Sequence, residues 1–378
     1  MSKLPLYFDN NATTPLDPKV LEAMLPYFRE HFGNPESVQH AYGWKAEAAL
    51  THAREQVAAI LHASSANEII FTAGATESMN LAILGYLFGL GQGCFHFITS
   101  VAEHKATLMI GERARELGHE VTLLPVNQFG QVETSDVLAA VKDNTVMVSL
   151  MHANNEIGSI NPITEIGVAL RARGGIVFHV DAAQTVGKTP IDVEAMGIDL
   201  LSLSAHKFFG PKGVGALYVR RATHLEPIMV GGGQERGLRS GTHNVPGIVG
   251  LGEACAIATR ELPEEALRLT GLRDKIIRAL LAPGHIELNG HATERVCNNI
   301  HFTVHGVPAD KILTGLSDIA FSTASACAAG GPSHVLRAIG REGNDPLSSS
   351  MRFGLGRFTT EGEVDTLIAR VREIVHKI

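Results

Sequence analysis

The sequence predicts an α/β protein with a large, doubly wound, mostly parallel sheet and a smaller α+β domain beside it. From about residue 18 to residue 259, short runs of apolar residues alternate with amphipathic stretches long enough to form helices. Such runs are typical of strands that are buried on both faces of a parallel sheet. After Pro263 the pattern changes, and a chain of 378 residues is long enough for two domains.

Five apolar runs give the clearest strand predictions in the first part of the chain. They are EIIFTA (68–73), HFITS (96–100), VMVSLMH (146–152), GIVFHVDA (175–182) and IDLLSLSAH (198–206). In a doubly wound sheet, ligands bind beyond the carboxyl ends of the strands. The polar residues that close these runs are therefore the first candidates for a functional site.

The second part of the chain has a different order of elements. After Pro263 the pattern predicts a helix, strands around 286–290 and 298–304, a glycine-rich segment with Cys327, and a final helix over 362–378. We expect a large domain at 16–259. Residues 1–15 and 260–378 are expected to form the small one.

Composition and charge exclude several classes of function. The formal net charge is −7 and the lysines and arginines form no cluster, so we expect no nucleic-acid binding. The longest apolar run, Leu81 to Leu90, is too short to span a bilayer, and the N-terminus lacks the apolar core of a secretory signal. We therefore expect a cytoplasmic protein without membrane contact. The four cysteines show no CxxC spacing, so neither a disulfide framework nor a metal site is expected.

A first candidate site follows the run EIIFTA. In TAGATESMNLAI (72–83) a strand ends in a turn of small residues and leads into a helix. Backbone N–H groups at such a helix start, beside the hydroxyl of Thr76, suit an anion such as phosphate. A plain helix cap explains the same residues, and for this motif alone it is the better explanation.

Two more candidates close the runs at 175–182 and 198–206. Asp181 follows IVFHV, where a buried carboxylate needs a cationic or N–H partner, although a helix-capping aspartate explains it equally well. Lys207 ends SLSAHK, and lysine is rarely placed at the inner end of a buried strand unless it is paired or chemically used. A desolvated lysine forms Schiff bases, so we favour this function over a solvated side chain.

Together these residues suit an aldehyde-bearing pyridine phosphate. Such a cofactor needs a lysine for its imine, an acid at its ring nitrogen, donors for its phosphate and a group that covers the ring. In that order, the sequence offers Lys207, Asp181, Thr76 with Ser204 and His206, and His104. For His104 alone, a surface histidine at a helix start would be the safer explanation.

Ten motifs carry a family resemblance over nearly the whole chain. They are YFDNNATTPLDP (7–18), FGNPESVQH (32–40), GATESMN, AEHKATL, MHANNEIGSINPI, VDAAQTVGK, SAHKFFGPKGVGALYV, GGGQERGLRSGT (231–242), ASAC and MRFGLGRFTTEGEVD (351–365). In these motifs the chain resembles the cysteine desulfurases of the NifS/IscS group, which are class V, fold-type I pyridoxal-phosphate enzymes. The resemblance implies a seven-stranded sheet, bound pyridoxal 5′-phosphate and a homodimer.

The resemblance also implies a role for individual residues. At the cofactor, it makes Lys207 the Schiff-base lysine and Asp181 the partner of the ring nitrogen. It makes Gln184 the partner of the phenolic oxygen, and His104 the residue that stacks on the ring and moves a proton at the substrate thiol. The implied phosphate ligands are Ala75, Thr76, Ser204, His206 and, from the neighbouring subunit, Thr242.

On the substrate side, the resemblance makes Arg352 the clamp for the substrate carboxylate, a role that suits bidentate guanidinium geometry. A surface strand residue is the less favoured explanation, because the flanking residues are apolar. Asn155, which also lies near the cofactor, and Asn34 are implied to line the same site. Cys327 would be the nucleophile that takes the sulfur as a persulfide.

The expected activity is the conversion of L-cysteine to L-alanine, with the sulfur passed to an acceptor protein such as an iron–sulfur scaffold. A selenocysteine lyase, or a desulfurase dedicated to tRNA thiolation or DNA phosphorothioation, is the alternative within the same fold. A catalytically silent binding partner is the alternative from another class, and the joint presence of Lys207, Asp181, His104, Arg352 and Cys327 argues against it.

The segment around Cys327 departs from the family pattern. Only AAGG separates Cys327 from Pro332, where the family has a longer polar stretch. Glycines lower the cost of moving the backbone, so a reactive thiol is a better interpretation than a buried filler. Because the segment is short, we expect Cys327 to be ordered and to lie some distance from Lys207.

Overall fold

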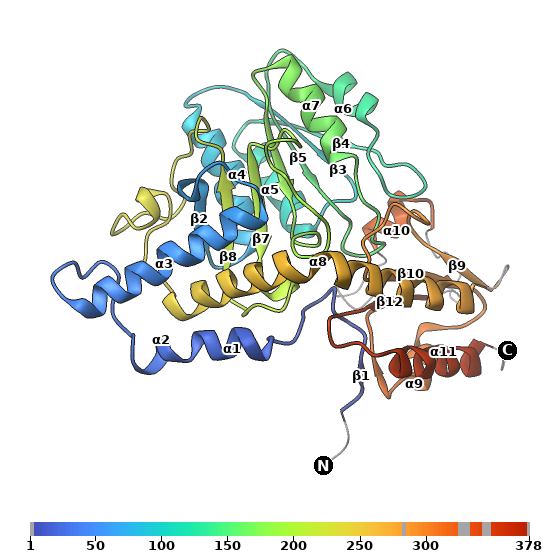
Figure 1. Ribbon diagram of the computed structural model, residues 1–378. Helices are drawn as coiled ribbons and strands as arrows, with labels where there is room; N and C mark the ends of the chain where they lie inside the picture. The colour runs from blue at the N-terminus through green and yellow to red at the C-terminus, as the bar shows by residue number, and fades with distance from the viewer. Residues whose placement is uncertain (1–3, 282–284, 324–332, 342–348, 376–378) are drawn as a thin grey trace.

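The computed structural model describes residues 4–281, 285–323, 333–341 and 349–375. Its main sheet has seven strands in the order β2-β8-β7-β6-β5-β3-β4 (Figure 1). Their bounds are β2 Ile69–Thr72, β3 His96–Ser100, β4 Glu120–Leu124, β5 Thr145–Met151, β6 Val177–Asp181, β7 Leu200–Ser204 and β8 Gly215–Val219. Only β8 runs antiparallel to its neighbours, so the predicted mostly parallel sheet is confirmed.

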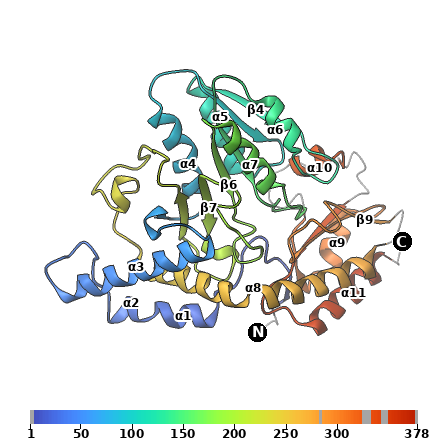
Figure 2. The same ribbon diagram turned by 45° about the horizontal axis from the view of Figure 1, so that its top comes forward.

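Helices cover both faces of this sheet, which explains why its strands read as continuous apolar runs (Figure 2). One core packs α3 (Ala41–Ile60), α7 (Ile163–Arg173) and the first half of α8 (Val245–Leu280) against the sheet. The other core packs α4 (Ala75–Gly89) and α5 (Lys105–Glu116) against the opposite face. Shorter helices complete this part, namely α1 (Pro18–Met24), α2 (Pro26–Arg29) and α6 (Thr134–Ala140).

Helix α8 corrects one prediction. The sequence predicts a new helix after Pro263, whereas the structure has one helix of 36 residues with Pro263 inside it. Proline removes a backbone hydrogen bond and disfavours a helix interior. The helix continues because its two halves are held in different cores: Cys255 and Ala258 pack in the large one, and Leu272 and Ile276 in the small one.

The second part of the chain builds around a three-stranded antiparallel sheet in the order β12-β10-β9. Its elements are β9 Ile286–Leu288, β10 Asn299–Val304, α9 Ala309–Gly315, β11 Ile319–Ala320, α10 His334–Ala338, β12 Ser349–Gly354 and α11 Glu361–Val375. The N-terminal strand β1 (Leu6–Tyr7) pairs with β11. The domain boundaries at residues 15 and 260 stay a prediction, since α8 runs through residue 260.

An ion-pair cluster around Arg357 links the two parts of the chain. Its Nη1 donates to Asp17 Oδ2 at 2.7 Å and its Nε to Glu265 Oε2 at 2.9 Å. Asp17 is buried and caps α1, where its Oδ1 accepts the N–H of Lys19. The guanidinium also stacks over the ring of Phe209 at 4.7 Å.

Arg357→Ala is therefore expected to lower the free energy of unfolding by about 3 kcal/mol, because it leaves the buried Asp17 carboxylate without its cation. Arg370→Ala is the matched control. Arg370 pairs with Asp318 at the surface, where solvent screens the pair, so its loss should change the stability little. Urea denaturation of both variants would measure the difference. Equal losses would contradict a structural role specific to Arg357.

Candidate active site

A cavity of about 870 Å³ lies at the carboxyl ends of the parallel strands. Parallel neighbours end at the same edge of a sheet, so residues that close β3, β5, β6 and β7 converge there. The cavity lining includes ten of the residues singled out in the sequence: Ala75, Thr76, His104, Asn155, Asp181, Gln184, Ser204, His206, Lys207 and Arg352.

Lys207 reaches the cavity from a short 3-10 turn directly after β7. Its Nζ donates to the backbone oxygens of Asn11 at 2.9 Å and Ala12 at 2.7 Å. The N-terminal segment also contacts the preceding residue, since the ring of His206 lies 3.0 Å from the hydroxyl of Thr13. The start of the chain thus forms a wall of the site. Sequence reasoning missed Asn11 and Ala12, although both lie in the motif YFDNNATTPLDP.

Asp181 is the last residue of β6 and is buried. Burial raises its pKa, while the N–H of Ala183, which donates to Oδ1 at 2.9 Å, lowers it. The charge of Lys207 also lowers it, as does His104 when its ring is protonated. Asp181 is therefore a carboxylate that depends on nearby positive charge.

His104 caps α5, because its Nδ1 accepts the N–H of Ala106 at 3.1 Å. The neutral ring must then carry its proton on Nε2. Loss of solvent lowers the pKa of His104; the carboxylate of Asp181 opposes this shift, and Lys207 adds to it. A neutral histidine that still carries an N–H can exchange a proton with a ligand near neutral pH.

Gln184 is fixed by a pair of hydrogen bonds with Asn11. Its Nε2 donates to Asn11 O at 3.0 Å, and Asn11 Nδ2 donates to its Oε1 at 3.2 Å. Behind it, the Nζ of the buried Lys188 lies 3.5 Å from the same Oε1. Burial, and then the charge of Lys207, lower the pKa of Lys188 to about 7.

The start of α4 forms the opposite end of the cavity. A Cβ on Gly215 would lie 2.7 Å from the Cα of Gly74, so glycine is needed for β8 to pass this turn. Ala75 and Thr76 at the helix start line the same cavity as Ser204. Burial and the neighbouring Lys207 lower the pKa of His206 to about 4. Neutral donors around a helix N-terminus fit a phosphate group.

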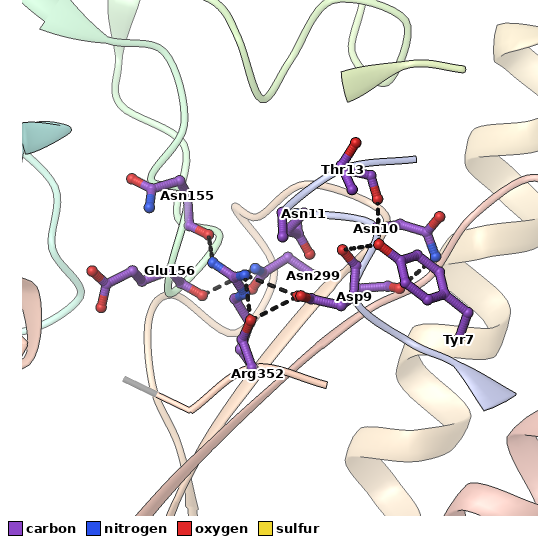
Figure 3. A network of polar contacts seen from close by, with 12 residues as sticks. Tyr7, Asp9, Asn10, Asn11, Thr13, Asn155, Glu156, Asn299 and Arg352 are labelled. Atoms are coloured by element: carbon purple, nitrogen blue, oxygen red, sulfur yellow. Dashed lines mark hydrogen bonds and ion pairs between the residues drawn. The ribbon is translucent and has the colours of Figure 1, made fainter. Parts of the chain in front are cut away.

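Arg352, on β12, lies at the junction of the two parts of the chain (Figure 3). Its Nη2 contacts Asp9 Oδ1 and Ser322 Oγ, each at 2.9 Å, and its Nη1 donates to Asn155 O at 3.0 Å. Its Nε is buried and has no hydrogen-bond partner within the described parts of the chain. The guanidinium is thus held by Asp9, a residue that sequence reasoning missed.

Three residues singled out in the sequence are not brought to this cavity. Asn34 is exposed and caps its own turn, where its Oδ1 accepts the N–H of Glu36. Thr242 is also exposed and does not line the cavity of its own chain. Cys327 lies outside the described residues, so its order and its distance from Lys207 stay predictions. The described parts of the chain contain no cluster suited to a metal ion and no helix long and apolar enough to cross a membrane.

The other cysteines differ in their surroundings. Cys94 is exposed, whereas Cys255 and Cys297 are buried. Burial raises the pKa of the Cys297 thiol to about 11 and raises that of Cys255 as well. Neither buried thiol is therefore suited to act as a thiolate nucleophile at neutral pH.

Comparisons with known proteins agree with this geometry. A family model described as "Aminotransferase class-V" matches residues 6–367. The "Cysteine desulfurase IscS" of Anaeromyxobacter dehalogenans is 48% identical over 381 residues, which cover 100% of this chain and 94% of that protein. A solved structure titled "NIFS-LIKE PROTEIN" superposes with a TM-score of 0.92 at 37% identity and covers 99% of this chain and 100% of that one. Another, "SspA in complex with cysteine", has a TM-score of 0.83 at 38% identity, with 94% and 100% coverage.

The buried Lys188 predicts a pH dependence of folding. The pKa of Lys188 is about 7 in the folded protein and 10.5 for an ordinary lysine, which stands for the unfolded chain. Between these pH values the unfolded chain therefore binds more protons than the folded protein. The free energy of unfolding should then rise with pH across this range, by up to about 1.4 kcal/mol per pH unit, and Lys188→Met should lose this rise.

Urea denaturation of the cofactor-free protein at several pH values would measure the effect. Lys212→Met removes an exposed lysine of the same cavity and should keep the wild-type slope. If Lys188→Met also keeps that slope, Lys188 is not held deprotonated by burial.

Proposed function

The chain belongs to the aminotransferase class-V family, and we propose which of its residues carry out the reaction of a cysteine desulfurase, the conversion of L-cysteine to L-alanine. Members of this group depend on pyridoxal phosphate, so the protein is a pyridoxal-phosphate-dependent enzyme. The observation that carries the mechanism is the convergence of Lys207, Asp181 and the donors at the start of α4 on one cavity.

The residues of the cavity fit this cofactor. When bound, pyridoxal phosphate supplies an aldehyde that a lysine amine can hold and a ring that accepts electrons from the substrate Cα. Lys207 would hold the aldehyde carbon, and Asp181 would keep the ring nitrogen protonated. Gln184, whose amide is fixed by the pair of hydrogen bonds with Asn11, would donate to the phenolic oxygen.

The start of α4 would hold the phosphate at the opposite end of the cavity. The amides of Ala75 and Thr76 and the side chains of Thr76, Ser204 and His206 would donate to its oxygens. In a dimer, Thr242 of the second copy would complete this set. His104 would cover the ring face.

On the substrate side, we assign the carboxylate to Arg352 and Asn155. Asn34 of the second copy lines the same site. Because Asp9 holds the guanidinium through Nη2, the orientation of Arg352 is set before the substrate binds. His104 moves a proton at the substrate thiol, and Lys207 removes the proton from Cα.

The sulfur transfer is assigned to Cys327. Its thiolate forms a bond to the substrate sulfur as the bond between that sulfur and carbon breaks, and the electron pair stays with the carbon fragment. Protonation of that fragment yields L-alanine and leaves a persulfide on Cys327. An acceptor protein, such as an iron–sulfur scaffold, then takes the sulfur. A reducing cytoplasm suits this thiol, and we place the enzyme there.

A homodimer is proposed on the basis of an exposed apolar face. We call the five residues Phe28, Phe32, Val38, Tyr42 and Trp44 the aromatic face; their exposed fractions run from 52% to 69%. An exposed apolar cluster of this kind is typical of a protein interface. Asn34 does not line the cavity of its own chain, and in sequence it lies among the residues of the aromatic face. In a dimer formed through this face, Asn34 would line the cavity of the second copy.

Phe32→Asp should therefore convert the dimer to a monomer, because it places a charge in the aromatic face. Leu267→Asp is the control, since Leu267 is 76% exposed on α8, away from that face. Sedimentation velocity would measure the molecular mass of both variants. A monomeric wild type, or a dimeric Phe32→Asp variant with native circular dichroism, would contradict the proposed interface.

Cys327→Ser tests the activity itself. The variant should keep the visible absorbance of bound cofactor and should lose more than about a hundredfold in sulfide and alanine release from L-cysteine, because the hydroxyl cannot accept the sulfur. Cys94→Ser removes an exposed thiol and should match the wild type. Normal sulfide release by Cys327→Ser would remove Cys327 from the mechanism. A wild-type protein that releases selenide from L-selenocysteine but no sulfide from L-cysteine would instead indicate the lyase.

A further inference from the structure

The carboxyl group of Glu103 is buried next to the active site, and no step proposed above uses it. Its side chain is fully covered, with 0% exposure. Oε1 accepts two hydrogen bonds, from Ser100 Oγ at 3.0 Å and from the backbone N–H of Met151 at 3.1 Å. Oε2 is buried and has no hydrogen-bond partner among the residues that the structure describes.

Both groups that contact the carboxyl are neutral donors. An ionised carboxylate in such a place would be an uncompensated buried charge, which costs several kcal/mol. A protonated carboxylic acid avoids this cost, because it keeps both accepted hydrogen bonds on Oε1 and carries its proton on Oε2. The contacts therefore favour the neutral form.

The position of Glu103 connects it to two residues of the site. Along the chain, it directly precedes His104. Across the sheet, the Met151 that donates to it is the residue on β5 that pairs with Asp181 on β6. The backbone oxygen of Glu103 also contacts His334 Nε2 on α10 at 2.8 Å. Glu103 thus ties the end of β3 to β5, one strand away from Asp181.

We propose that Glu103 is a positioning residue for the reaction: a neutral carboxylic acid that holds the end of β3, and with it the adjoining His104 at the start of α5, against β5 and leaves Asp181 as the ionised carboxylate at these strand ends. The inference rests on the proposed function. The neutral state of Glu103 matters for the site, because a second negative charge one strand away from Asp181 would repel that carboxylate and would be an uncompensated buried charge between β3 and β5.

The titration of Glu103 follows from these surroundings. Burial raises the pKa of Glu103 to about 8; the N–H of Met151 opposes the shift, Asp181 adds to it, and Ser100 opposes it. The other titratable groups nearby are His104, which follows it in sequence, His334 on its backbone oxygen, and Lys207, which faces both Asp181 and His104. Above about pH 8 the neutral acid should therefore be lost.

Glu103→Gln gives the test on the holoenzyme, because glutamine has the same shape and stays neutral at every pH. The ratio of kcat/KM for L-cysteine, variant over wild type, should lie near one at about pH 6.5 and rise to roughly five- to tenfold at about pH 9. Substrate ionisation cancels in this ratio. The visible absorbance of the bound cofactor should change near pH 8 in the wild type, and this change should be absent in the variant. A ratio that stays constant with pH, or that falls far below one at the lower pH, would overturn the proposal.

Ser100→Ala provides a second variant that leaves Glu103 in place. Ser100 stabilises the ionised form by donating to Oε1, so its removal should shift the alkaline limit of activity to higher pH. A shift to lower pH, or no shift, would contradict the assignment. This variant keeps the proposal falsifiable if Glu103→Gln does not fold.

Folding of the cofactor-free protein separates this inference from the proposed function. A carboxyl whose pKa is raised by folding binds its proton more tightly in the folded state. The wild type should therefore lose stability relative to Glu103→Gln as the pH rises from about 4.5 to about 8. This loss is expected even if the protein releases no sulfide. If the denaturation midpoints of the wild type and of Glu103→Gln change with pH in the same way across that range, Glu103 is not neutral in the folded protein. This conclusion would hold whether or not the enzyme releases sulfide.

Discussion

The parallel alignment of β3, β5, β6 and β7 is the constraint on which the rest of the structure depends. Because these strands share one direction, the residues that close them meet at one edge, and the helices on both faces keep water from the sheet beneath. The resulting environment sets the chemistry of the site. Asp181, His206, Lys188 and Glu103 are all buried enough for desolvation to shift their pKa values, each toward its neutral form.

The N-terminal segment joins this edge to the second part of the chain. Its backbone oxygens at Asn11 and Ala12 hold the amine of Lys207, and the carboxylate of Asp9 holds the guanidinium of Arg352. Strand β1 pairs with β11 only a few residues earlier, so the same segment contacts Lys207 in the large part of the chain and Arg352 in the second part. The two side chains are thereby fixed relative to each other by contacts that span nearly the whole sequence.

Much of the large sheet could be predicted because its strands are short apolar runs, and each run found in the sequence corresponds to a strand of the structure. Pro263 was misinterpreted since local propensity cannot show that both halves of α8 are held in separate cores. Asp9 and Asn11 were missed as individual residues because their contacts join positions more than a hundred residues apart. Asn34 and Thr242 were named from family motifs alone, and neither residue lines the cavity of its own chain.

The central claim is that Lys207 holds the cofactor while the neighbouring lysines do not. Lys188 and Lys212 offer a natural comparison, since one lies behind Gln184 and the other lines the same cavity. Borohydride reduction of the holoenzyme, followed by proteolysis and mass spectrometry, would locate the covalently attached pyridoxal group. The label is expected on the peptide with Lys207. A label on Lys188 or Lys212, or no label on a coloured protein, would contradict this assignment.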